Sequence, residues 1–155
     1  ISSAASDVYK RQIIAAQMYA RMLALSGMPS EFGSFVVSSE FSIMSMILLY
    51  ILLVILMGTI LDSGSIMLIL VPLMYPILVT LNIDLIWFGI VTVIAVEVGL
   101  LTPPLGISVF VIKSSLDDKS ITLGDIFIGA FPFAIMMIAV LFLVLAFPQL
   151  TTFLL

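Results

Sequence analysis

A pair of adjacent prolines between two apolar runs is the feature that most limits how this chain can fold. Pro103 and Pro104 lie in the stretch 97–106, EVGLLTPPLG. Proline has no backbone N–H, its ring clashes with the preceding helical turn, and it pushes the residue before it, Thr102, toward extended geometry. We therefore predict that a helix entering this stretch breaks and restarts, with free carbonyls on one side and free N–H groups on the other.

The glycines around the proline pair strengthen this prediction. Gly99 and Gly106 allow backbone angles and close approaches that other residues do not. The flanking segments are apolar enough for lipid, where irregular backbone is tolerated only if protein buries it or it lines a cavity. Broken helices at membrane depth are the places where secondary transporters bind ions and substrate. The stretch is therefore typical of a carrier.

Composition sets the class of protein. The chain is 63% hydrophobic and 9% charged, whereas a soluble domain is about half apolar and about a quarter charged. A net charge of -4 and the lack of a basic patch argue against nucleic-acid binding. The chain has no cysteine and no histidine, so its residues offer no disulfide, thiolate, histidine-ligated zinc or Ser-His-Asp triad. We expect a membrane protein that is not an enzyme and carries no cofactor.

The first residues differ from the rest. Segment 1–12 is polar and ends abruptly at an apolar run. It resembles the translated read-through of a sequencing adapter, so we treat it as a non-native scar and exclude it from fold reasoning. Residues 13–155 then form the protein proper, which we expect to begin in the middle of a longer chain.

The segment 13–37 allows two interpretations. Its first part, 13–26, has helical composition but falls short of the roughly 20 residues that cross a bilayer. Pro29 after Gly27 stops that helix, and Ser30 offers a new helix start. The segment is either a re-entrant hairpin or the end of a truncated spanning helix followed by a loop. Within it, Arg21 either reaches toward the interface or faces a counter-charge.

The remaining chain reads as several spanning segments. They are 41–61, 66–81 with Pro72 and Pro76, 86–101 with Trp87 near its start, and 126–147 with Pro132. We expect the first of these to be the clearest spanning helix and Trp87 to be an interfacial anchor. The polar segment 113–125 is predicted to face water, and its two lysines weakly favour the cytoplasmic side.

Two carboxylates lie near apolar surroundings, where a charge is costly and is a functional hypothesis by default. Asp62 either caps the next helix together with Ser63, or belongs to an unwound segment with several oxygens. Glu97 either pairs with Arg21, approaches the far interface, or serves a site. Thr102 places a hydroxyl beside freed carbonyls, which suits a hard cation such as Na⁺.

Several short motifs follow one another in a characteristic order. They are Gly58-x-x-x-Asp62, Pro72 with Pro76, Asn82-Ile83-Asp84, Phe88-Gly89, and Glu97-x-Gly99-Leu100-Leu101-Thr102-Pro103-Pro104-x-Gly106. Over residues 13–155 this order resembles the C-terminal half of the large membrane subunit of tripartite ATP-independent periplasmic (TRAP) transporters. The resemblance implies an all-α, multi-pass helical bundle with a re-entrant hairpin and broken helices. It would be one repeat of an inverted-repeat, elevator-type transporter, with the N-terminal half absent.

The resemblance also implies a function and a site. The function would be Na⁺-coupled uptake of an organic acid, such as a dicarboxylate or sialic acid, across the bacterial inner membrane. A small membrane subunit and a periplasmic substrate-binding protein would be the partners. By position, the resemblance implies Ser63, Gly64 and Ser65 at one break and Gly99, Thr102 and Pro103 at the other. The full set of candidate site residues adds those that the residues themselves indicate, namely Asp62, Glu97, Pro104 and Gly106. Na⁺, the coupling ion, would lie near Ser65, Gly99 and Thr102, and helix N-termini would face the substrate carboxylate.

Three other functions fit the residues less well. An intramembrane aspartyl protease needs a close pair of aspartates, and Asp62 follows Thr-Ile-Leu without an intramembrane partner. A channel predicts a repeated filter or a charged ring, and neither is visible in the sequence. A structural membrane subunit without a transport site is the main alternative, but it has no need of helices broken at depth. The residues do not indicate which acid is carried.

Overall fold

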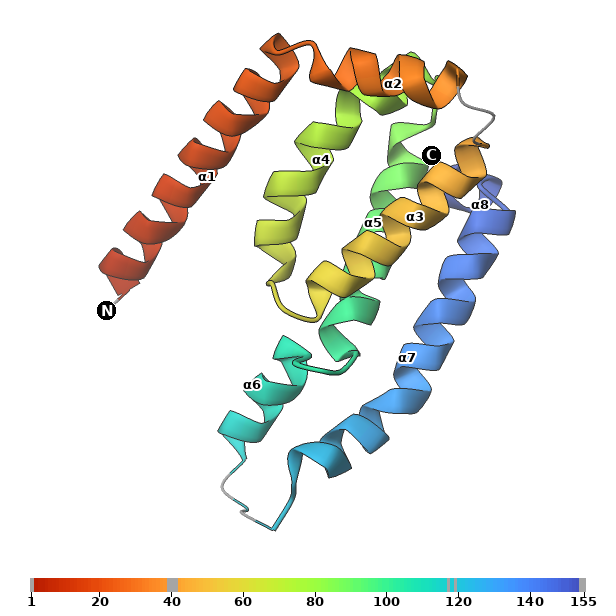
Figure 1. Ribbon diagram of the computed structural model, residues 1–155. Coiled ribbons are helices and arrows are strands. Elements are labelled where there is room, and N and C mark those ends of the chain that lie inside the picture. Colours follow the sequence, from red (N-terminus) through yellow and green to blue (C-terminus); the bar gives the residue numbers. More distant parts are fainter. Residues whose placement is uncertain (1, 39–41, 117, 119, 154–155) are drawn as a thin grey trace. The chain divides into compact units, whose positions relative to one another are not determined.

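The computed structural model describes residues 2–38, 42–116, 118 and 120–153, and every regular element in these ranges is an α-helix (Figure 1). The helices are α1 (Ser2–Leu25), α2 (Met28–Ser38), α3 (Ile43–Gly58), α4 (Ser63–Thr80), α5 (Leu85–Leu101), α6 (Ile107–Ser115), α7 (Leu123–Ala146) and α8 (Gln149–Thr152). The prediction of an all-α protein is confirmed.

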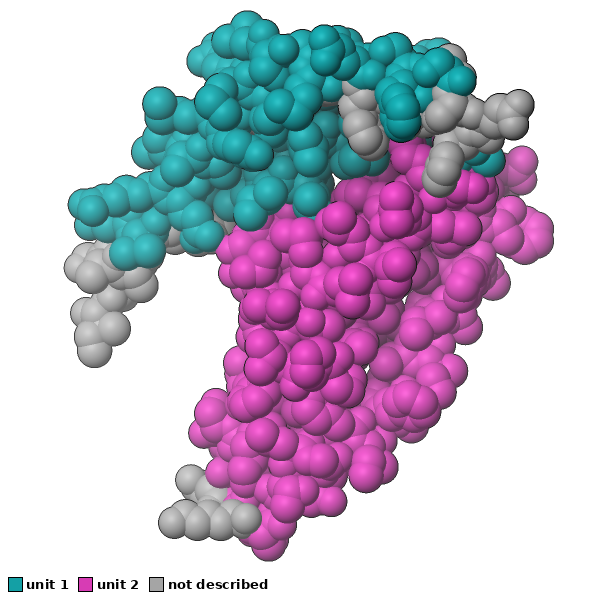
Figure 2. Space-filling model, viewed as in Figure 1, with its two compact units in different colours: residues 1–42, 67–83 teal, residues 43–66, 84–155 magenta. Residues whose placement is uncertain are grey.

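The chain forms two compact units (Figure 2). One contains Ile1–Ser42 and Met67–Ile83, and therefore α1, α2 and most of α4. The other contains Ile43–Ile66 and Asp84–Leu155, and therefore α3, the first turn of α4, and α5 to α8. Both predicted helix breaks belong to this second unit.

In the first unit, α1 and α2 are joined by a tight turn at Gly27, which has a φ of +74°. The Gly27 carbonyl accepts hydrogen bonds from the N–H groups of Ser30 (3.0 Å) and Glu31 (3.1 Å), which start the new helix. Residues 28–38 are therefore helical, as the hairpin interpretation requires, whereas the alternative predicted a loop. Re-entry into a membrane stays a prediction.

The helix predicted over 13–26 is longer than expected. It begins at Ser2 and passes without a break through the proposed boundary between 1–12 and 13–155. The short polar and alanine residues of this segment are compatible with helical backbone, so a change in composition does not end the helix. The division of the chain at residue 12 stays a prediction.

The second unit is built around α5, which packs against α3 on one side and α7 on another. Tyr50 of α3 lies against Phe88 of α5 with ring centroids 4.7 Å apart. The Tyr50 hydroxyl is also hydrogen-bonded to Thr92 Oγ1 at 3.1 Å. Because the ring is buried with its hydroxyl paired, this contact fixes how α3 and α5 align.

Trp87 does not present its ring as an interfacial anchor. Its side chain is only 6% exposed, and its Nε1–H donates a hydrogen bond to the Val144 carbonyl of α7 at 2.8 Å. A buried indole N–H needs an acceptor, and a carbonyl in the last turn of α7 has no helical donor. Trp87 therefore joins the start of α5 to the end of α7, and the interfacial prediction is wrong.

Among the described residues, two helices are long and apolar enough to cross a membrane, namely Ser63–Thr80 and Leu123–Ala146. Both contain the prolines expected within them, Pro72 and Pro76 in α4 and Pro132 in α7. The segment predicted to be the clearest spanning helix, 41–61, gives the 16-residue α3, which is shorter than the roughly 20 residues that a span needs. The predicted helix length is therefore wrong at its C-terminal end, because the backbone leaves the helix after Gly58. Residue 41 lies outside the described residues, and whether this segment spans a membrane stays a prediction.

The polar segment 113–125 is organised by Lys113. Lys113 lies in the last turn of α6, and its Nζ donates hydrogen bonds to the carbonyls of Asp118 (3.3 Å) and Ile121. Asp118 in turn accepts hydrogen bonds from the hydroxyl and the backbone N–H of Ser120. These bonds hold the pKa of the exposed Asp118 carboxyl below its ordinary value. The described side chains between α6 and α7 are largely exposed, as a water-facing loop requires.

Candidate functional site

The first helix break lies between Gly58, the last residue of α3, and Ser63, the first residue of α4. The Thr59 N–H donates to the Leu56 carbonyl at 3.3 Å, and the Ile60 N–H donates to the Met57 carbonyl at 3.0 Å, each three residues back along the chain. The chain therefore tightens and ends α3 before it turns into α4. The break was predicted at Asp62 to Ser65, but it occupies residues 59–62.

Asp62 caps the N-terminus of α4. Its Oδ2 accepts a hydrogen bond from the Ser65 N–H at 2.9 Å, and its Oδ1 accepts one from Ser65 Oγ at 2.6 Å. Ser63, Gly64 and Ser65 form the first turn of that helix. This geometry is that of the capping interpretation. A role for these four residues in ion binding stays a prediction.

The second break matches the sequence prediction closely. Helix α5 ends at Leu101, and α6 begins at Ile107. Thr102 has extended backbone, with φ of -95° and ψ of 135°, and its N–H donates to the Gly99 carbonyl at 3.0 Å. The break between residues 102 and 106 is confirmed. Pro103 and Pro104 are exposed within it.

The proline pair leaves one particular carbonyl without a helical donor. In a continuing helix the Leu100 carbonyl would accept from residue 104, or from residue 103 in a tighter turn, and both are prolines. Accordingly, no backbone hydrogen bond within the described ranges ends on this oxygen. It points toward Gly106, because a Cβ added at Gly106 would lie 3.2 Å from it. The Leu100 oxygen is therefore a free acceptor at the second break.

Thr102 supplies a second oxygen at this break. Its hydroxyl donates its proton to the Val98 carbonyl at 2.6 Å. A hydroxyl has one proton and two acceptor lone pairs, so both lone pairs of Thr102 Oγ1 stay available to a cation. The described residues contain no group of three His, Cys, Asp or Glu side chains that could hold a metal ion. Hydroxyl and carbonyl oxygens are the ligands that this region offers.

The structure brings the two breaks together. The Gly106 N–H, at the start of α6, donates a hydrogen bond to the Thr59 carbonyl in the first break at 3.1 Å. Just before the breaks, α3 and α5 cross so closely that a Cβ at Gly58 would lie 2.9 Å from the Gly99 Cα. Two segments far apart in the sequence thus meet at one junction, formed by residues 58–59 of the first break and residues 99–106 of the second.

Glu97 is not part of this junction. It lies on an exposed surface of α5, whereas Gly99, two residues later, is buried against α3. Arg21, its predicted partner, belongs to the other compact unit. The pairing of Glu97 with Arg21 and any part of Glu97 in the site stay predictions.

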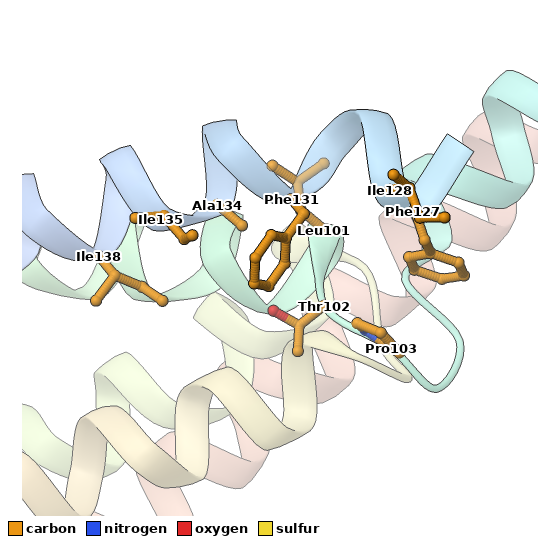
Figure 3. Close-up of a pocket in the computed structure, with 9 residues that line it drawn as sticks. All are labelled: Leu101, Thr102, Pro103, Phe127, Ile128, Phe131, Ala134, Ile135 and Ile138. Carbon is orange, nitrogen blue, oxygen red and sulfur yellow. The ribbon is translucent and has the colours of Figure 1, made fainter. Parts of the chain in front are cut away.

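An apolar pocket of about 420 Å³ adjoins the second break (Figure 3). Figure 3 shows Thr102 and Pro103 on one side of it and α7 side chains on the other. The lining residues are Leu101, Thr102, Pro103, Phe127, Ile128, Phe131, Ala134, Ile135 and Ile138. A carboxylate here would lose its hydration without gaining charged partners. The pocket by itself does not suit an anionic substrate.

Three contributors to the junction were not singled out as site residues from the sequence: Gly58, the Thr59 carbonyl and Phe127. Phe127 of α7 covers Gly106, since a Cβ there would lie 3.0 Å from its Cε1. The signal for Gly58 was available, because small residues near the ends of two apolar segments are typical of close helix packing in membranes. No side-chain pattern marks a backbone carbonyl such as that of Thr59.

Broken helices of this kind, together with two apolar helices long enough to span a bilayer, are typical of a membrane transport protein. Residues 11–150 match the family described as "Tripartite ATP-independent periplasmic transporter, DctM component". The chain therefore belongs to this family of membrane-embedded transport permeases, as its sequence motifs predicted.

Relatives with assigned names agree with the family. The chain is 30% identical over 136 residues to the C4-dicarboxylate TRAP transporter large permease protein DctM of Rhodobacter capsulatus, which covers 88% of this chain and 30% of that protein. It is 33% identical over 101 residues to the sialic acid TRAP transporter permease protein SiaT of Haemophilus influenzae, covering 65% of this chain and 16% of that protein. It is 27% identical over 139 residues to the sialic acid TRAP transporter large permease protein SiaM of Vibrio cholerae, covering 90% of this chain and 32% of that protein. The chain thus spans a third or less of the length of these relatives.

Proposed function

We propose that this chain is the C-terminal part of a large permease subunit that takes up an organic acid across the bacterial inner membrane, coupled to Na⁺. A small membrane subunit and a periplasmic substrate-binding protein complete the transporter. Family membership and the length of the relatives support this proposal. The relatives' names mention C4-dicarboxylate, sialic acid and isethionate, all of which are organic acids.

The observation that carries the proposal is the hydrogen bond between the two breaks, from the Gly106 N–H to the Thr59 carbonyl. It gathers irregular backbone from two helical segments at one place. The Leu100 carbonyl and Thr102 Oγ1 supply the oxygens there that suit Na⁺. A structural subunit, the alternative function, gains nothing from two broken helices that meet, whereas a carrier uses them to bind its ion.

The same junction also suits an anion. Helix α6 begins at a break without a side-chain cap, and a helix N-terminus carries a partial positive charge with unpaired N–H groups. The substrate carboxylate would face the start of α6, and Na⁺ would face the carbonyls at the ends of α3 and α5. The two opposite charges would then balance each other. In an elevator-type carrier built from inverted repeats, the other half of the protein supplies the remaining ligands.

The proposal is tested on the complete permease, reconstituted into vesicles with its small subunit and binding protein. Uptake of labelled sialic acid, succinate and isethionate is measured under an inward Na⁺ gradient and under an equal K⁺ gradient. We expect uptake of one of these acids that requires Na⁺ and saturates with it. Uptake at the same rate under either gradient would refute Na⁺ coupling.

A further inference from the structure

The crossing of α3 and α5 is closer than side chains would permit. A Cβ added at Gly99 would lie 2.6 Å from the Ile55 carbonyl oxygen and 2.8 Å from the Gly58 Cα. One added at Gly58 would lie 2.9 Å from the Gly99 Cα and 3.0 Å from the Val96 carbonyl oxygen. Every one of these neighbours is backbone. No side chain can turn away to make room, so a methyl group at either position must push the two helices apart.

The crossing lies next to both breaks. Thr59, whose carbonyl accepts the hydrogen bond from Gly106, directly follows Gly58. On the other helix, the Gly99 carbonyl accepts the Thr102 N–H, which sets the direction in which the chain leaves α5. A separation of the helices at the crossing therefore lengthens the bond between the breaks. It also moves the Leu100 carbonyl and Thr102 Oγ1 away from the first break.

We propose that Gly58 and Gly99 are positioning residues for the Na⁺ site. Their missing side chains let α3 and α5 touch, and this contact holds the oxygens of the two breaks at the spacing that the ion requires. The inference rests on the proposed function but goes beyond it, because it assigns Gly58 and Gly99 a role that depends on how closely their helices pack. Ligands displaced by a faulty supporting contact bind a metal about 10- to 100-fold more weakly.

The chain contains a matched control. Gly89 also lies in α5, but a Cβ added there meets no atom within 4 Å. The variant Gly89→Ala therefore makes the same chemical change in the same helix, without the close contact. Any general effect of alanine on helix stability appears in this variant as well.

The first measurement is the Na⁺ concentration that gives half-maximal uptake in the complete transporter. We expect Gly99→Ala to raise it by at least about tenfold, Gly58→Ala to raise it less because its contacts are longer, and Gly89→Ala to leave it unchanged. The KM for the acid at saturating Na⁺ is measured in parallel and should move less. If uptake by the unmodified protein depends on Na⁺ but Gly99→Ala leaves the Na⁺ concentration for half-maximal uptake unchanged, the positioning role alone is overturned. If uptake by the unmodified protein does not depend on Na⁺, the proposed function is overturned instead.

A second measurement needs no variant and therefore covers the case in which Gly99→Ala does not fold. Amide hydrogen exchange in the unmodified complete permease reports on the Gly106 N–H, the donor of the bond between the breaks. We expect this amide to be protected and to become more protected when Na⁺ is added. Exchange of Gly106 at the rate of an open peptide, with and without Na⁺, would overturn the inference.

Discussion

The two helix breaks satisfy their backbone groups in different ways. At the first break, the Asp62 side chain caps α4 through Ser65, so this helix start is closed by residues of its own segment. At the second break, Gly106 precedes α6 without any side-chain cap, and its N–H is bonded to Thr59 of the first break. The start of α4 is thus capped within its own segment, whereas the start of α6 depends on a contact with the first break. A helix start supported by another segment is more easily altered by what binds there.

The largest expected effect on stability is at Gly106, whose N–H joins the second break to the first. Gly106 has a φ of +52°, and a Cβ there would meet the Phe127 ring at 3.0 Å and the Leu100 oxygen at 3.2 Å. We expect Gly106→Ala to lower the free energy of unfolding by about 2–4 kcal/mol, from left-handed strain and overpacking together. Thermal unfolding of the complete permease in detergent measures this change.

Gly27 provides the control for Gly106. It also has a left-handed backbone, with φ of +74°, but a Cβ there meets nothing within 4 Å. Gly27→Ala should therefore cost only the backbone strain, about 1–2 kcal/mol. Equal losses in the two variants would mean that the packing of Phe127 and Leu100 around Gly106 contributes nothing, and the comparison between the breaks would fail.

The next effect concerns Thr102, which lies in the break that lacks a side-chain cap. Thr102→Val removes one oxygen at nearly constant volume, so we expect the Na⁺ concentration for half-maximal uptake to rise about tenfold. It also removes the bond from Oγ1 to the Val98 carbonyl, which should lower the free energy of unfolding by about 1 kcal/mol. Uptake in reconstituted vesicles and thermal unfolding give the two values.

The variant Thr80→Val is the control that separates the effect on Na⁺ activation from the effect on stability. Thr80 Oγ1 donates to the Pro76 carbonyl at 2.8 Å, a bond of the same type four residues back along the helix, at the opposite end of α4 from Asp62. Thr80→Val should produce a similar loss of stability and no change in Na⁺ activation. A normal Na⁺ response in Thr102→Val, with normal expression, would remove Thr102 from the site.

The sequence was more informative about the second break than about the first. Two adjacent prolines cannot continue a helix, so the end of α5 and the free Leu100 carbonyl follow from residue identity alone. Glycine only permits a break. The end of α3 at Gly58 was therefore predicted several residues too late, and the length of its helix was overestimated.

The junction itself was beyond the reach of sequence reasoning. The bond from Gly106 to Thr59 joins two backbone groups, which every residue carries, so no side-chain pattern indicates it. Trp87 was misread for a related reason. An amphipathic ring near a helix start fits an interface, but the Val144 carbonyl that accepts its N–H lies in a distant segment. Such pairings become visible only when the helices are packed.

The smallest expected effect tests whether Asp62 does no more than cap the start of α4. If Asp62 only caps α4, then Asp62→Ala should lower the free energy of unfolding by about 1 kcal/mol, whereas Asp62→Asn should be nearly neutral because asparagine caps equally well. Neither variant should change the Na⁺ concentration for half-maximal uptake. Asp84 is the matched control, since it caps α5 by accepting the N–H groups of Ile86 and Trp87, and Asp84→Ala should cost about as much. A raised Na⁺ requirement in Asp62→Asn, with stability intact, would show that the carboxylate faces the ion. The start of α4 would then take part in the ion site, and the contrast between the two helix starts would be lost.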